Sequence, residues 1–264
     1  MATPESESFI RSFARGLAVI EAMGKQGETH TVSSLAAATG LPRTVVRRVL
    51  LTLCDLGYAA TDQREFRLTP KVLNLGMTYL TSLPFWGHAQ RVLEDLCARV
   101  QESCAMTVFD GKSVTYVLRI PSRKILSLRL GVGSRISAYA TSPGRIALAY
   151  LPPAALDAYL AGKTFKAYTS RTVRDADTLR ERLAEVRRDG YAWVDGEYDE
   201  AICGLAVPVY DTQNNVVAAL NVNMLSRQTS REKAVEQVLG PLLEAAHGLN
   251  GIAPAFLAPV APPT

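Results

Sequence analysis

The side chains best suited to chemistry in this sequence lie within six residues of one another. They are Arg43, Thr44, Arg47 and Arg48. No acidic residue between Glu28 and Asp55 neutralises the three guanidinium groups, and arginine binds both guanine base edges and phosphate oxygens. We therefore predict a nucleic-acid surface here, against the alternative of an amphipathic helix that only faces water.

A helix-turn-helix unit at residues 32–51 would present these side chains. Two short helices that cross closely need a small residue at their contact, and Ala36 meets that need. The turn between them needs a positive φ angle, which Gly40 adopts without steric cost. Val46 is a branched apolar residue that can fill the crossing. Such a unit places its second helix in the major groove of DNA.

Elements on both sides predict a winged helix-turn-helix domain over residues 9–69. Ser33 is the expected N-cap of the second helix, and two extended runs around residues 61–63 predict a hairpin, the wing. A first helix at 8–23 is expected to turn one apolar stripe inward. That stripe consists of Ile10, Phe13, Leu17 and Ile20. The third helix is expected to bury Val46, Val49, Leu50, Leu53 and Leu56.

The predicted DNA contacts fall into two groups. Base edges are assigned to Arg43, Thr44 and Arg47. Phosphates or the minor groove are assigned to Arg48, Ser34, Arg15, Arg64 and Arg67, the last two on the wing. Residues 1–80 hold nine Lys/Arg and seven Asp/Glu, a balance of +2, so affinity must depend on this local face rather than on total charge.

A second group of polar residues lies in the later part of the chain. ATSPGR (140–145) predicts a junction between a strand and a helix starting near Arg145, where Ser142, Pro143 and free N–H groups could meet an anion. An ordinary capped helix is the alternative. Asn221 and Asn223 share one face of an otherwise apolar strand. Buried amides need polar partners, and a polar ligand is one possibility.

Four charged residues near these segments complete the predicted ligand site. Arg129 and Arg135 flank a predicted turn and could pair with a carboxylate, although each could equally be a surface residue. Asp195 and Glu197 could accept a hydrogen bond from a ligand hydroxyl or simply belong to a loop.

The elements that must position this second group are short strands alternating with helices. The fold class predicted is α+β, with an antiparallel sheet and flanking helices. We assign residues 70–83 to a linker helix, 84–252 to an effector-binding domain, 1–8 to a disordered segment and 253–264 to a loose tail. The strand expected at 124–130 would contribute to the sheet. A continuous last helix at 230–250 is expected to bury Val235, Val238, Leu242 and Leu243.

Composition narrows the class of protein. The chain has 264 residues, 48% of them hydrophobic and 20% charged, with a net charge of +4, which suits two globular domains. The start MATPESESF is not a signal peptide and no run reaches the length of a membrane span. The four cysteines lack metal or disulfide spacing. We expect a cytoplasmic protein with no membrane partner, no metal and no cofactor.

Enzymatic motifs are missing from the sequence. It has three histidines, far apart, and contains no HExxH, GxSxG, GxGxxG or P-loop. Nucleophilic catalysis needs a nucleophile and a base within hydrogen-bond reach, and the sequence offers no such pair. We therefore do not expect an enzyme. An enzyme acting on carboxylic acids stays open as a remote alternative.

With both domains placed, the chain resembles the IclR family of bacterial transcription regulators over residues 8–250. In the first domain the resemblance is carried by SFARGLAVIEAM, VSSLAAATGLPRTVVRRVLLTL, LGY and FRLTPKVLNLG. In the second it is carried by ATSPGRIALAYL, GYAWVDGEYDEAICGLAVPVYD and VVAALNVNM. LSLRLGVGSRISAYATSPGR and AALNVN resemble the branch that governs aromatic-acid catabolism through the β-ketoadipate route (the PcaR, PcaU and PobR types).

The resemblance implies a GAF-like effector domain that binds a small organic acid, aromatic or dicarboxylic, and dimers that pair into tetramers on a palindromic operator. It places ligand contacts at Ile125, Leu128, Ser142, Pro143, Glu197, Asn221 and Asn223. Pro143 stands where methionine is expected in that branch, and Val194, beside Asp195, stands at an acidic position of another branch. A second domain that only oligomerises is the alternative to an effector sensor.

Overall fold

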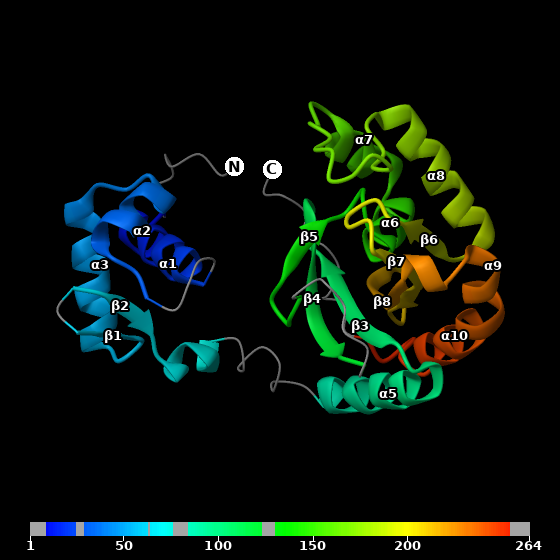
Figure 1. Ribbon diagram of the computed structural model, residues 1–264, viewed down its shortest axis with the longest axis horizontal. Coiled ribbons are helices and arrows are strands. Elements are labelled where there is room, and N and C mark those ends of the chain that lie inside the picture. The colour runs from blue at the N-terminus through cyan, green and yellow to red at the C-terminus, as the bar shows by residue number, and fades with distance from the viewer. Residues whose placement is uncertain (1–8, 25–28, 63, 76–83, 123–129, 254–264) are drawn as a thin grey trace. The chain divides into compact units, whose positions relative to one another are not determined.

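The computed structural model describes residues 9–24, 29–62, 64–75, 84–122 and 130–253. The chain divides into two compact units, Met1–Leu83 and Pro84–Thr264 (Figure 1). The predicted α+β fold class is confirmed, with a winged helix-turn-helix in the first unit and an antiparallel sheet with helices in the second.

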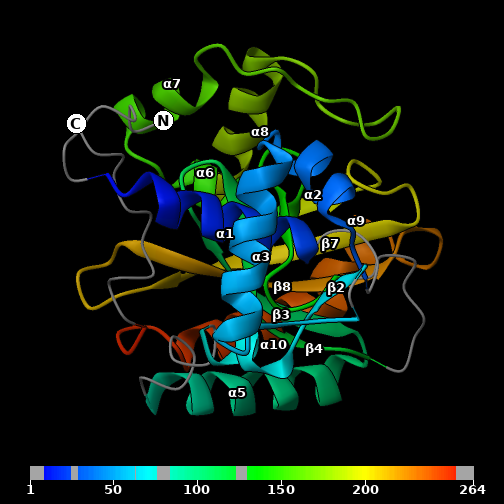
Figure 2. The ribbon, with the colours of Figure 1, turned by 90° about the vertical axis from the view of Figure 1, so that its left-hand side faces the viewer.

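In the first unit the described residues include α1, α2, α3 and a hairpin. Their bounds are α1 Arg11–Met23, α2 Val32–Thr39, α3 Arg43–Asp55, β1 Ala59–Thr61 and β2 Phe66–Leu68. Figure 2 views this unit with α3 in front and α1 and α2 packed against it. Gly40 ends α2 with a φ of 69°, as the turn requires. Val46, Leu50 and Leu35 fill the core where the helices cross.

Two details of α2 and α3 differ from expectation. Thr31, not Ser33, caps α2: its hydroxyl accepts a hydrogen bond from the Ser34 N–H, while the Ser34 side chain bonds back to the Thr31 backbone. This reciprocal capping box needs a polar side chain three residues after the N-cap, and the residue three after Ser33 is Ala36. Leu56 is 54% exposed because α3 ends at Asp55, so its side chain no longer follows the helical stripe.

The inward face of α1 was predicted wrongly. Ile10, Phe13 and Leu17 are 67%, 66% and 43% exposed, whereas Val19 and Met23 are buried. The face that packs on α2 and α3 carries smaller side chains, because close helix crossings favour them. The large apolar residues are left on the outer side of the helix.

The second unit is built on a six-stranded antiparallel sheet in the order β5-β4-β3-β8-β7-β6. The strands are β3 Ser103–Phe109, β4 Ser113–Ile120, β5 Arg135–Ser137, β6 Ala192–Asp195, β7 Ile202–Tyr210 and β8 Val216–Leu225. The helices are α5 Pro84–Val100, α6 Ser142–Ala149, α7 Pro153–Leu160, α8 Ala176–Asp189, α9 Arg231–Ala234 and α10 Gly240–His247. The 3-10 turns are η1 Pro70–Val72, in the first unit, and η2 Ser226–Gln228.

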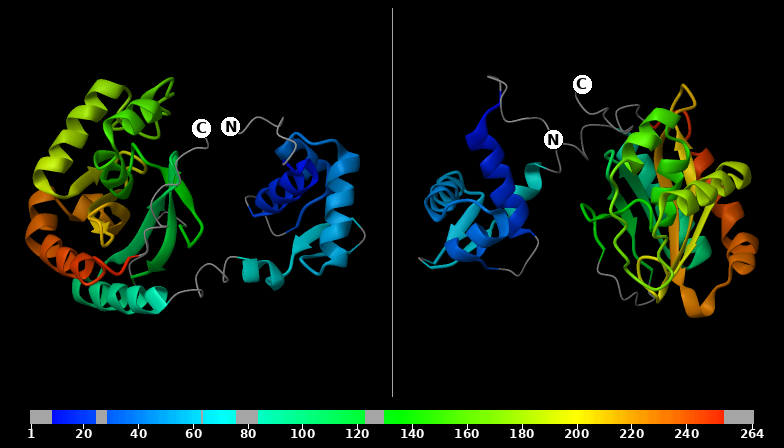
Figure 3. Two further views of the ribbon diagram at one scale, coloured as in Figure 1. Left: turned by 180° about the vertical axis from the view of Figure 1, so that it is seen from behind. Right: turned by 90° about the horizontal axis from the view of Figure 1, so that it is seen from above.

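The helices cover both faces of this sheet. α6 packs on β7 and β8, with α8 against α6, whereas α5 and α10 pack together on the other face. Figure 3 shows α5 beside α10 and, across the sheet, α8. The core on the α6 side includes Ile146, Leu148 and Leu179, all with no exposed surface.

Several element boundaries in this unit correct the expectations. α6 begins at Ser142 rather than near Arg145, because Pro143 fits the first turn of a helix. α7 was not predicted. The last helix is interrupted by a π-helical turn, η3 Val235–Leu239. That wider turn shifts the helical phase, so Leu243 is 46% exposed and Ala246 is buried instead.

Some expectations fall on residues outside those the structure describes. They are the disordered segment 1–8, most of the linker helix (76–83), most of the strand at 124–130 and the tail at 254–264. Within the described residues, no helix combines the length and apolar character needed to cross a lipid bilayer.

Candidate functional site

The outward side of α3 carries the arginines predicted to contact DNA. Arg43, Thr44, Arg47 and Arg48 are all exposed. None of the three guanidinium groups forms a salt bridge within the part of the chain that the structure describes. Val46 and Leu50 anchor the opposite side of the helix in the core. The arrangement holds a cationic face rigidly toward solvent, as groove binding requires.

The remaining predicted DNA contacts surround this helix within the first unit. Ser34 and Arg15 are exposed on α2 and α1, and Arg64 and Arg67 are exposed on the hairpin. The hairpin turn is ordered by Asp62, whose carboxylate accepts hydrogen bonds from the Glu65 and Arg64 N–H groups. Those bonds lower the pKa of Asp62, so the turn keeps its shape at neutral pH.

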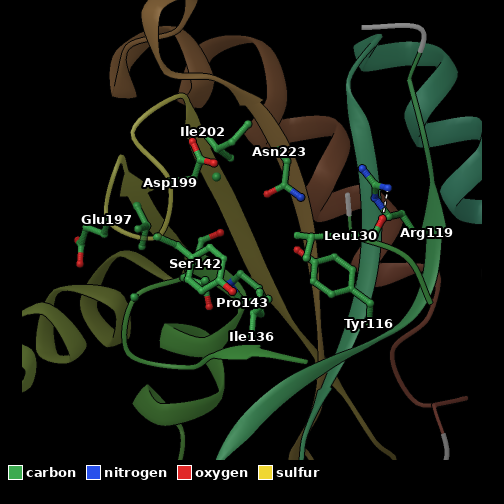
Figure 4. A pocket seen from close by; sticks show the side chains of 15 residues that line it. Tyr116, Arg119, Leu130, Ile136, Ser142, Pro143, Glu197, Asp199, Ile202 and Asn223 are labelled. Atoms are coloured by element: carbon green, nitrogen blue, oxygen red, sulfur yellow. Dashed lines mark hydrogen bonds between the residues drawn. The ribbon is translucent and has the colours of Figure 1, made fainter. Parts of the chain in front are cut away.

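A hollow in the second unit lies between the start of α6, strand β4, the β7–β8 pair and the loop after β6 (Figure 4). Its cavity volume is about 40 Å³, smaller than that of ordinary sites for small organic ligands. Its walls are mixed: Leu130, Ile136 and Val194 are apolar, whereas Tyr116 and Arg119 bring polar groups.

One cross-strand row beside this hollow contains two polar residues whose hydrogen bonds are incomplete. Arg119 on β4 lies opposite Ala105 on β3, which lies opposite Asn221 on β8, followed by Ala206 on β7. Residues directly opposite in an antiparallel sheet share a face. The buried Arg119 Nε and both polar atoms of the Asn221 amide lack a hydrogen-bond partner of normal geometry among the described residues. Ala105 alone lies between the two polar residues.

The next row supplies hydrogen-bonding groups at the mouth of the hollow. Asn223 lies opposite Gly204, and Figure 4 shows its side chain pointing inward. A Cβ atom on Gly204 would lie 2.6 Å from Ser142 Oγ and 3.3 Å from Asn223 Oδ1, so the missing side chain keeps this space open. Burial raises the pKa of Tyr116, and the nearby Asn223, Arg119 and Asn221 side chains oppose that rise. Tyr116 therefore stays a neutral hydroxyl at physiological pH.

Glu197 lines the hollow but its carboxylate is used elsewhere. It accepts hydrogen bonds from Arg145 Nη2 at 2.6 Å to each oxygen, and from the Val173 N–H at 3.3 Å. Figure 4 shows it pointing away from Tyr116 and Arg119. Burial lowers the pKa of Arg145, and the charge of Glu197 opposes this. This buried ion pair fixes the loop after β6 to α6.

The other predicted ligand residues are distributed unevenly. Ser142, Pro143 and Asn223 line the hollow, and Asn221, with no exposed surface, lies beside it. Arg135 is instead paired with Asp110 at the sheet edge, and Asp195 with Arg171 and Ser226. Neither lines the hollow. Ile125, Leu128 and Arg129 lie outside the described residues.

Sequence reasoning missed Tyr116, Arg119, Tyr198 and Ile202, which all line the hollow. One signal was available: Arg119 is a cation in the apolar run SVTYVLRI, and a charged group within a strand needs a partner. The described residues contain no group of three or more His, Cys, Asp or Glu side chains placed to hold a metal ion.

Comparison with known proteins gives a family match for each of the two units. The family described as "IclR helix-turn-helix domain" matches residues 12–63, and "Bacterial transcriptional regulator IclR C-terminal" matches residues 77–250. The chain belongs to the IclR family. It is therefore a transcriptional regulator rather than an enzyme, as its sequence predicted.

Individual IclR relatives confirm the resemblance to the aromatic-acid branch. The Pca regulon regulatory protein of Pseudomonas putida is 38% identical over 91% of this chain and 83% of its own length. The p-hydroxybenzoate hydroxylase transcriptional activator of Acinetobacter baylyi is 32% identical over 94% and 93%. A crystal structure of an IclR homolog from Microbacterium hydrocarbonoxydans, complexed with 4-hydroxybenzoate, is 26% identical with a TM-score of 0.78, covering 90% of this chain and 97% of that one.

Proposed function

We propose that this IclR-family regulator senses a hydroxylated aromatic carboxylic acid in the hollow beside β4 and β8. The observation that carries the proposal is the pair of incompletely bonded polar groups, Arg119 Nε and the Asn221 amide, on one face of the sheet. An unpaired buried polar group costs free energy, and an entering ligand that bonds to it recovers that cost.

The lining suggests an orientation for the acid. Its carboxylate would meet Arg119, whose Nη1 already donates to the Leu130 carbonyl and so fixes the guanidinium plane. Its ring would lie against Ile136 and Val194. Its hydroxyl would reach Asn223 and Tyr116, which can donate or accept. Glu197, held by Arg145, would support the wall without contacting the carboxylate.

The relatives support this ligand class. The homolog from Microbacterium hydrocarbonoxydans is complexed with 4-hydroxybenzoate, and the activator from Acinetobacter baylyi is named for p-hydroxybenzoate hydroxylase. By analogy, we propose that the present chain is a cytoplasmic protein that controls genes for aromatic-acid catabolism.

On DNA, we propose that the protein acts as a homodimer, or a dimer of dimers, on a palindromic operator. The outer face of α1 supports self-association because Phe9, Ile10, Phe13 and Leu17 are 40%, 67%, 66% and 43% exposed, more than a monomer ordinarily presents in one place. Two copies would direct two α3 helices at two half-sites. Acid binding would then shift the population of dimers whose spacing fits the operator.

Titration calorimetry tests the sensor. We expect 4-hydroxybenzoate or 3,4-dihydroxybenzoate to bind, and methyl 4-hydroxybenzoate, which lacks the carboxylate charge, to bind at least about tenfold more weakly, since one charge-assisted hydrogen bond is worth roughly 1.5–3 kcal/mol. If no hydroxybenzoate binds while operator DNA, selected from a random library, still does, the second domain would be an oligomerisation domain only.

A further inference from the structure

A second hollow in the effector domain is much larger than the first. It runs between α7, the outer side of α6 and the end of the β3–β8 pair. Its cavity volume is about 1050 Å³, against about 40 Å³ for the first. That lies at the upper end of ordinary sites for small ligands, so a single-ring acid would not fill it. We call it the α7 groove.

Most of the lining of the α7 groove is apolar, although Thr107, Thr164, Asn214 and Asn215 also contribute to it. Its floor is formed by Val217, Ala218 and Ala219 of β8. One wall is formed by Phe109 and Tyr159, whose ring centroids lie 6.0 Å apart in an edge-to-face arrangement. Alanines of α6 and α7 line the other side. The small residues leave space, and the rings offer apolar surface to an organic body.

Two lysines at the rim of the groove, Lys163 and Lys112, have no carboxylate partner among the described residues. Lys163 Nζ lies 4.3 Å from the centroid of the Tyr159 ring and 5.6 Å from that of Tyr139. Desolvation, and then the nearby charge of Lys112, lower the pKa of Lys163. Two like charges held near each other create a local demand for an anion.

The acidic residue closest to Lys112 in sequence does not form a salt bridge with either lysine. Asp110 also lines the groove, but its carboxylate is paired with Arg135 and accepts the N–H groups of Lys112 and Ser113. The buried Tyr159 hydroxyl has no hydrogen-bond partner within the described part of the chain, and burial raises its pKa. Tyr159 is therefore a neutral hydroxyl beside the Lys163 cation, which lies over its ring.

We infer that the α7 groove is a second ligand site, for a carboxylate carried on an apolar body larger than one ring. The carboxylate meets Lys163 and Lys112 at the rim and can accept a hydrogen bond from Tyr159. The apolar body lies along β8 beneath α7. This chemistry fits a medium-chain fatty acid or a multi-ring aromatic acid.

The two sites share one structural element. Pro143, in the first turn of α6, lines both the α7 groove and the smaller hollow. A ligand that shifts α6 from one side alters the wall of the other site, and any such coupling is reciprocal by thermodynamic linkage.

Calorimetry with two probes, decanoate and 4-phenylbenzoate, tests the proposal on the full-length protein. We expect at least one to bind, and decanol to bind at least about tenfold more weakly because it lacks the charge. Lys163→Ala should weaken binding by about tenfold. Lys166→Ala is the matched control: Lys166 is exposed in the same segment, over the Tyr168 ring at 5.1 Å, and does not line the groove. It should leave affinity unchanged.

A blocking variant separates the groove from the smaller hollow. Ala158 is exposed on α7 and lines the groove, so Ala158→Trp should abolish probe binding without disturbing the core. Arg119→Ala should leave probe binding intact even though it removes hydroxybenzoate binding. Probe affinity lost in Arg119→Ala but kept in Ala158→Trp would place the probes in the smaller hollow and overturn the inference. Failure of both probes to bind the unaltered protein would also overturn it, as would a change of oligomeric state in Ala158→Trp, which would mark the groove as a protein interface.

Discussion

Arg119 and Asn221 lie in the same cross-strand row of the effector-domain sheet, each directly opposite Ala105. Both retain polar atoms without a hydrogen-bond partner of normal geometry in the described portion of the chain. The Arg119 guanidinium and the Asn221 amide therefore lie on one face of the sheet, separated by the methyl group of Ala105. Of the two, Arg119 lines the hollow, where its guanidinium, already positioned by β4, could meet the carboxylate of an entering acid.

The role proposed for Arg119 predicts a loss that lysine cannot repair. Arg119→Ala should weaken 4-hydroxybenzoate binding by about ten- to a hundredfold, the value of one or two charge-assisted hydrogen bonds. Arg119→Lys should recover little, because an ammonium lacks the planar fork. Calorimetry measures both. Arg135→Ala, which removes an arginine paired at the sheet edge, is the control and should bind normally. Equal affinity in all variants would exclude Arg119 from the site.

The face of α3 predicts the behaviour of two arginines on DNA. Arg43→Ala with Arg47→Ala should abolish preference for the selected operator, because these residues are assigned to base edges. Arg48→Ala should weaken specific and random DNA alike and reduce the salt dependence of binding, because a lost phosphate contact releases fewer counterions. Fluorescence anisotropy at several salt concentrations distinguishes the two. Arg182→Ala, in the other unit, controls for the loss of positive charge.

The exposed side of α1 predicts an association defect. Phe13→Glu places a charge in the apolar patch, so it should convert dimers to monomers in sedimentation velocity and weaken binding to a full palindrome far more than to a half-site. Leu73→Glu is a suitable control, since Leu73 is 64% exposed outside that patch. A dimer that persists in Phe13→Glu would require another interface.

The buried Arg145–Glu197 pair predicts a strong asymmetry between single and double variants. Arg145→Met leaves the carboxylate of Glu197, a residue only 9% exposed, without its cationic partner. The variant should lose about 3–5 kcal/mol of stability. Adding Glu197→Leu should restore much of it, because no charge is then left buried. Both tryptophans, Trp86 and Trp193, lie in the second unit, so urea unfolding followed by their fluorescence reports on this unit alone. Additive losses would contradict the pairing.

The first unit was the easier part to predict. The positions of Ala36, Gly40 and Val46 follow from local rules of helix crossing and turn geometry, and all three act within the unit itself. The error on α1 has a clear cause. Hydrophobic periodicity identifies an apolar stripe but does not say whether it faces the protein's own core or another molecule, so Phe13 was placed inside.

The ligand hollow was only partly predictable. Ser142 could be found from sequence because it stands at a predicted strand-to-helix junction, and Asn221 and Asn223 because they interrupt an apolar strand. Arg119 and Asn221, in contrast, become neighbours through the pairing of β3 with β4 and with β8, and strand register is not visible in one sequence. Glu197 was assigned to the ligand because its partner, Arg145, is 52 residues away in sequence.

Alanine substitution at two glycines near the hollow should have different effects, on stability at one and on ligand affinity at the other. At Gly144 the new Cβ would collide with the backbone of Ala138, which cannot move aside, so Gly144→Ala should lower the melting temperature markedly. At Gly204 the new Cβ would meet the side chain of Ser142 at 2.6 Å, and that hydroxyl can rotate away. Gly204→Ala should therefore fold with near-normal stability and bind 4-hydroxybenzoate at least about tenfold more weakly, because the methyl group occupies ligand space. Thermal unfolding and calorimetry on the same two variants check this, and normal affinity in a folded Gly204→Ala would place the acid elsewhere.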